Sequence, residues 1–142
     1  MKINFAFALN NEKMFEKKHF GEAELYAIYT YEKGELKHSE TLPNSFISMT
    51  EEKVHGSKEK GDAIITLLKE RNVSVLVSMQ FGKNIKMVSQ HFIPVIIDED
   101  RTDQVVEIIV RNIKWIKDEL KNRNSGFMLF RIKTGILKTA VE

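Results

Sequence analysis

The sequence contains no cysteine. This absence excludes a disulfide framework, a thiolate zinc site, a Cys-ligated iron–sulfur cluster and a cysteine nucleophile. No apolar run approaches the ~18 residues that a membrane-spanning helix needs, and residues 1–15 lack the apolar core and cleavage site of a secretory signal. We therefore expect a cytoplasmic protein with no membrane association.

A strong excess of one charge is also absent. The chain has 22 Lys and Arg residues against 20 Asp and Glu residues, which leaves a net charge of +2. A dedicated nucleic-acid binder usually carries a clear basic excess. The sequence also lacks GxGxxG, GxxxxGK[ST] and GxSxG motifs, which disfavours nucleotide phosphate loops and the α/β-hydrolase arrangement. We expect no nucleic-acid partner and no enzymatic activity.

The order of the predicted elements is typical of an α/β fold in one domain. Aromatic and β-branched runs predict the strands, and apolar residues at steps of three and four predict the helices. A two-residue connection, Lys33–Gly34, predicts a β-hairpin. In chain order, the expected elements are a strand at 2–9, a hairpin of strands 25–32 and 35–41, a helix at 62–71, a strand at 73–79, a helix at 82–92 and a strand at 94–98.

Three further segments complete the prediction. Residues 42–61 are polar and have no evident structure, which is long for a compact domain and typical of a functional loop. Residues 102–123 show the apolar spacing of one amphipathic helix with Thr102 as its N-cap. The tail at 125–142 is strand-like but has no evident partner. We therefore expect a single domain at 1–124 followed by a separate tail.

Ligands of open α/β sheets bind where the carboxyl ends of parallel strands, loops and helix N-termini converge. Three segments are expected there: residues 10–21, 54–61 and 80–84. Their glycines allow a close approach of the backbone to a ligand, Lys83 adds a positive charge, and the imidazoles of His19 and His55 can ligate a metal. A turn or capping role for these histidines is the competing interpretation. The candidate ligand-binding residues are His19, Gly21, His55, Gly56, Gly82 and Lys83.

The collinear segments KINFAFAL, HFGEAELYAIYTYEKGEL, HG, IITLLKERNVSVLVS, QFGKNIKMV and HFIPVII resemble the dinitrogenase iron-molybdenum cofactor biosynthesis family, whose NifX/NifY-like domains also occur at the C-terminus of NifB. The resemblance covers about residues 1–100. It implies a ribonuclease H-like fold with a mixed five-stranded sheet flanked by helices, here followed by a C-terminal helix and tail.

The resemblance also implies a function. Family members bind or carry iron-molybdenum cofactor, its precursors or other anionic metal–sulfur clusters, without catalysis, and work with cluster-assembly or nitrogenase proteins. It makes His19 and His55 the metal ligands and Gly82 the glycine of the strand–helix turn. This chain departs from the family pattern at Asn10, where members often have Asp, and at bulky Phe81.

A second hypothesis is that the chain has lost cluster binding and acts as a protein-interaction or regulatory module. Here residues 102–142 would bury apolar surface in a homodimer or against a partner protein. The consecutive apolar residues Phe127, Met128, Leu129 and Phe130 would mark that interface if they were exposed.

Overall fold

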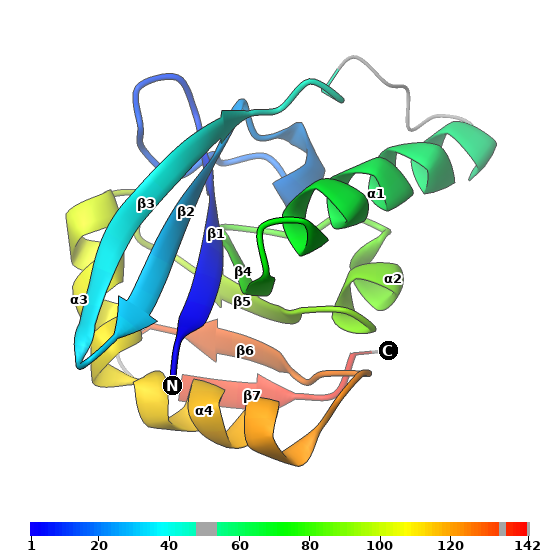
Figure 1. Cartoon of the computed structure of the whole chain (residues 1–142). Helices are drawn as coiled ribbons and strands as arrows, with labels where there is room; N and C mark the ends of the chain where they lie inside the picture. Colours follow the sequence, from blue (N-terminus) through cyan, green and yellow to red (C-terminus); the bar gives the residue numbers. More distant parts are fainter. Residues whose placement is uncertain (48–53, 134–135, 142) are drawn as a thin grey trace.

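The computed structural model contains one seven-stranded sheet with helices on both faces (Figure 1). It describes residues 1–47, 54–133 and 136–141, and the side chains of residues 54–57 lie outside this description. The strands are β1 (Ile3–Leu9), β2 (Leu25–Glu32), β3 (Glu35–Pro43), β4 (Val73–Ser78), β5 (Ile93–Ile97), β6 (Leu129–Ile132) and β7 (Ile136–Thr139). The helices are η1 (Phe20–Glu22), α1 (Val54–Lys69), α2 (Ile85–Ser89), α3 (Thr102–Arg111) and α4 (Ile113–Asn122).

The sheet is mixed, as expected for this α/β class. Its strand order is β3-β2-β1-β4-β5-β6-β7. Strands β1, β4, β5 and β6 run parallel, whereas β2, β3 and β7 are antiparallel to their neighbours. The expected count of five strands is wrong, because the tail adds two strands to the edge at β5.

Alternating side chains on the central strands explain why helices cover both faces. Phe5 and Phe7 of β1 belong to the core under α3 and α4. Ala6 and Ala8 of the same strand face the core under α1 and α2. Because both faces of β1 are buried, the strand is a nearly continuous apolar run, which is the pattern of a central strand.

The β2–β3 hairpin is confirmed at the predicted turn. Lys33 and Gly34 both have positive φ, at 55° and 82°. Two consecutive residues with positive φ form the type I′ turn, whose twist suits two-residue hairpins. The register pairs Glu32 with Glu35 directly beside this turn.

The helices differ from prediction in their bounds. Helix α1 begins at Val54 rather than 62, so residues 54–61 at the end of the expected loop are helical, whereas α2 is limited to five residues. The expected helix at 102–123 is interrupted at Asn112. The Asn112 side chain donates to the carbonyl of Ile108 at 2.9 Å, which is the local competition by which Asn disfavours helix interiors.

The first part of the tail, at residues 127–130, is packed into the fold. Phe127, Leu129 and Phe130 are buried, and Met128 packs against the core under α3 and α4. The exposure that would mark this run as an interface is therefore not observed, because these side chains pack inside the fold and β6 pairs with β5.

A buried carboxylate ties the tail to α4. Glu119 is fully buried and accepts a hydrogen bond from the backbone N–H of Met128 at 2.8 Å. Its carboxylate also lies 2.9 Å from Arg123 Nε and 2.9 Å from Lys138 Nζ of β7. One side chain thus joins α4 to β7 and to the loop that precedes β6.

In the described part of the chain, no helix is both long and apolar enough to cross a lipid bilayer.

Candidate functional site

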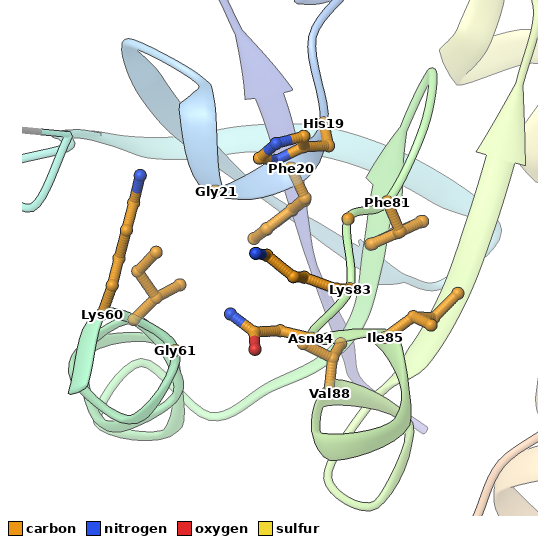
Figure 2. A pocket seen from close by; sticks show the side chains of 12 residues that line it. His19, Phe20, Gly21, Lys60, Gly61, Phe81, Lys83, Asn84, Ile85 and Val88 are labelled. Carbon is orange, nitrogen blue, oxygen red and sulfur yellow. The ribbon is translucent and has the colours of Figure 1, made fainter. Parts of the chain in front are cut away.

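A hollow lies beyond the carboxyl ends of β1 and β4, at the edge of the sheet where ligands were expected. It is enclosed by the loop that follows β1, one side of α1, and the β4–α2 connection (Figure 2). The residues lining it are His19, Phe20, Gly21, Lys60, Gly61, Ile64, Phe81, Gly82, Lys83, Asn84, Ile85 and Val88. All three segments expected at this edge contribute to its wall.

Two hydrogen bonds hold the two loops of the hollow together. The backbone N–H of Phe20 donates to the carbonyl of Gln80 at 3.0 Å, and the Gln80 side chain donates to the carbonyl of Lys17 at 2.6 Å. The rings of Phe20 and Phe81 stack with centroids 5.6 Å apart and an angle of 13°. Bulky Phe81 therefore forms part of the wall and stacks on Phe20.

Side-chain hydrogen bonds from two buried residues hold the turn that carries His19. The hydroxyl of Tyr26 donates to the carbonyl of Phe20 at 2.9 Å, and the buried Asn44 amide donates to the carbonyls of Gly21 and Ala23. The Asn44 bonds satisfy carbonyls at the end of the short helix η1, whereas the carbonyl of Phe20 also accepts from the backbone N–H of Ala23 at 3.3 Å. The position of His19 at the N-cap of η1 is therefore set by buried polar groups.

His19 lies against Gly82. A Cβ atom added at Gly82 would stand only 3.1 Å from both Cγ and Nδ1 of the imidazole, which is tighter than ordinary van der Waals contact. A larger residue at this position would require the His19 ring to shift by a few tenths of an ångström. The imidazole is half-buried, so one part of the ring packs on the wall and another part remains accessible.

Positive charge surrounds the hollow on two sides. Lys83 is exposed on the α2 side of the hollow, and Figure 2 shows its amine pointing into the space between the β4–α2 connection and α1. Lys60 approaches from α1 with a side chain that is 1% exposed, and its ammonium lies 2.8 Å from the carboxylate of Glu22. The hollow itself has a volume of about 30 Å³, which is room for one or two water molecules.

Four of the six predicted ligand-binding residues lie together at the hollow: His19, Gly21, Gly82 and Lys83. His55 and Gly56 fall in the first turn of α1, where side chains lie outside the described residues. Their predicted roles are therefore untested.

The candidate ligand set omits Lys60, Phe81 and Asn84, although the segments 54–61 and 80–84 that contain these wall residues are expected at this edge. A signal existed for Lys60, because it precedes the core residues Ile64 and Leu68 by steps of four on one face of α1.

A cage built by the protein for a single metal ion is not seen in the described residues, where no group of three or more His, Asp or Glu side chains could hold one. A preassembled metal–sulfur cluster has different needs. Its metals already carry sulfide ligands, so it requires fewer ligands from the protein than a single metal ion does.

Comparison with known proteins identifies the family to which the chain belongs. The family model for dinitrogenase iron-molybdenum cofactor matches residues 1–114, which includes every wall residue of the hollow and reaches beyond the expected limit near residue 100 into α4. A search of curated proteins returned no match. Because the match spans well over half of the 142 residues, this chain belongs to the dinitrogenase iron-molybdenum cofactor family.

Proposed function

We propose that the chain is a non-enzymatic carrier that binds iron-molybdenum cofactor, one of its precursors or a related anionic metal–sulfur cluster as cargo. The observation that carries the proposal is the position of His19 in the wall of the hollow, with Lys60 and Lys83 beside it. An imidazole offers a nitrogen ligand to an exposed metal of the cluster. The Lys83 ammonium adds a positive charge that favours an anion, and Lys60 adds a second one that Glu22 partly offsets.

The size of the hollow decides where such a cargo sits. A volume of about 30 Å³ is smaller than one metal with four sulfides, because metal–sulfur bonds are about 2.3 Å long. The cluster would occupy the mouth of the hollow, with His19 below it and part of its surface in solvent. A seat of this kind leaves the cluster accessible to a receiving protein, as a carrier requires.

The family also suggests the partners and the fold. Its description points to nitrogenase-related proteins, and we infer that proteins of cluster assembly deliver or receive the cargo. The five strands β1 to β5 would correspond to the sheet of the ribonuclease H-like fold, and β6 and β7 would be additions of this chain.

Anaerobic titration with tetrathiomolybdate, followed by visible absorbance, tests the proposal. We expect a coloured complex with one ligand per chain, and a loss of affinity of at least tenfold in His19→Ala. His91→Ala is the matched control, since His91 is exposed and does not line the hollow. Equal binding by His19→Ala and the wild type would remove His19 as the ligand and end the proposal.

The same titration assigns the second predicted ligand. If His55 shares the metal, His55→Ala weakens binding, and the double variant with His19→Ala abolishes the coloured complex. If it does not, His55→Ala binds as the wild type does and His19 acts alone. Repeating the measurement with isolated iron-molybdenum cofactor shows whether the complete cluster binds at this seat.

A further inference from the structure

We propose that the Lys60–Glu22 ion pair sets the charge of the ligand that the hollow accepts, with Lys60 favouring multiply charged anions and Glu22 limiting how tightly they are held. The inference rests on the function proposed above and adds a specificity-determining pair to it. Neither residue belongs to the candidate ligand set that the sequence predicts.

The first observation is the depth of the Lys60 charge. Its side chain is 1% exposed, although it belongs to the helix face that places Ile64 and Leu68 in the core. Burying an ammonium group requires a compensating partner, since desolvation of a charge is expensive. Glu22 supplies that partner through a hydrogen bond of 2.8 Å.

The second observation is that the pair is asymmetric with respect to the hollow. Lys60 lines it, whereas Glu22 does not and retains 27% of its side-chain exposure. Water therefore screens the carboxylate more than the ammonium. Lys60 is therefore the member of the pair that lies at the wall of the hollow, and its charge is the less screened of the two.

Lys83 does not provide the same selectivity. Its side chain is exposed, so its charge is screened by water and salt and contributes mainly to the attraction of anions from solution. A buried charge is screened much less. The dependence of affinity on ligand charge should therefore follow Lys60.

Tetrahedral thiometalates separate charge from shape. Tetrathioperrhenate is a monoanion and tetrathiomolybdate is a dianion of nearly the same size. We expect wild-type protein to bind the dianion on the order of tenfold more tightly, because a second unit charge interacts with a poorly screened ammonium. Both ligands are added alone to the full chain in anaerobic titrations at low and moderate salt.

Three variants test the pair. Lys60→Met keeps the length of the side chain but removes the charge, and we expect the preference for the dianion to disappear. Lys60→Arg restores the charge and should restore the preference. Glu22→Gln keeps an oxygen acceptor for Lys60 and removes the opposing charge, so it should tighten dianion binding several-fold. Lys58→Met, an exposed lysine of the same helix, is the matched control and should change neither affinity.

The outcomes separate a failure of this inference from a failure of the proposed function. Opposite shifts in Lys60→Met and Glu22→Gln support the inference, whereas weakening of both anions by both variants shows a purely structural pair and overturns it. If Lys60→Met does not fold, as judged by circular dichroism, a loss of the dianion preference in Lys60→Arg or weaker binding in Glu22→Gln overturns it instead. If wild-type protein binds neither anion, or His19→Ala binds both normally, the proposed function falls and takes this inference with it.

Discussion

Replacing Glu119 by Ala should detach the C-terminal strands from α4 and destabilise the whole domain. The substitution leaves the Met128 N–H without its acceptor, and it removes the carboxylate from Arg123 and Lys138. Breaking a buried pair in this way typically costs about 3–5 kcal/mol. Arg123 and Lys138 are 44% and 35% exposed and can turn to water, so we expect the lower end, about 3 kcal/mol.

Urea denaturation followed by circular dichroism measures this loss, and Glu107→Ala on the exposed face of α3 is the control. A change of about 3 kcal/mol corresponds to a fall in Tm of roughly 10 °C for a domain of this size. A loss below about 1 kcal/mol in Glu119→Ala would refute the idea that the carboxylate holds the tail in place.

The same side chain predicts a pH dependence. Burial raises the pKa of Glu119, but hydrogen bonds from Lys138 and Met128 and the charges of Lys138 and Arg123 outweigh it, so the pKa lies below its usual 4.5. Because the pKa of Glu119 is lower in the folded protein, the carboxylate stabilises the fold fully at pH values above its pKa in the unfolded chain. This stabilisation is lost as the pH falls through its pKa in the folded protein. The difference in unfolding free energy between wild type and Glu119→Gln should therefore shrink below about pH 4.5. A constant difference from pH 7 to pH 3 would contradict this.

Three further substitutions probe the site and its supporting loops. Gly82→Ala should push the imidazole of His19 by a few tenths of an ångström and weaken thiometalate binding several-fold with little loss of stability, because the new Cβ meets only a side chain. Gly34→Ala should cost about 1–2 kcal/mol in urea denaturation, because its φ of 82° is unfavourable for a residue with a Cβ. Asn10→Ala should cost about 1–2 kcal/mol, whereas Asn10→Asp should be nearly neutral, since only the side-chain oxygen accepts the N–H groups of residues 12 and 14.

Each of these has a contradicting result. Normal binding by Gly82→Ala would mean that the ring has room to move without consequence. Unchanged urea midpoints in Gly34→Ala or Asn10→Ala would mean that the turn and the loop relax without strain. The Asn10 comparison also addresses the departure from the family pattern, because its oxygen already organises the loop after β1.

Local sequence patterns predicted strands β1, β2 and β3 well. The run at β1 and the Lys33–Gly34 connection specify a strand and a hairpin through neighbours in the sequence alone, and the structure confirms both. The site could also be located in outline. Strands β1 and β4 are parallel neighbours, so the loops that follow them lie at the same end of the sheet. His19 and Gly82, which belong to these loops, were therefore expected to lie close together.

Long-range pairing and burial could not be predicted in the same way. Strand β6 joins β5 only after α3 and α4 have crossed the sheet, so no local signal identifies its partner. Lys60 has the chemistry of a surface residue, and only the position of Glu22 on another element allows it to be buried. The interruption at Asn112 was hidden because apolar spacing continues from α3 into α4.

The seven-stranded sheet has a practical consequence for protein production. A fragment ending at residue 114, the limit of the family match, would lose Ile116 and Phe130 from the interior and leave β5 as an open border of the sheet. Free backbone donors and acceptors on such a border recruit strands from other molecules. We expect that fragment to aggregate on expression, so recombinant protein for work on the hollow should retain the β6–β7 hairpin.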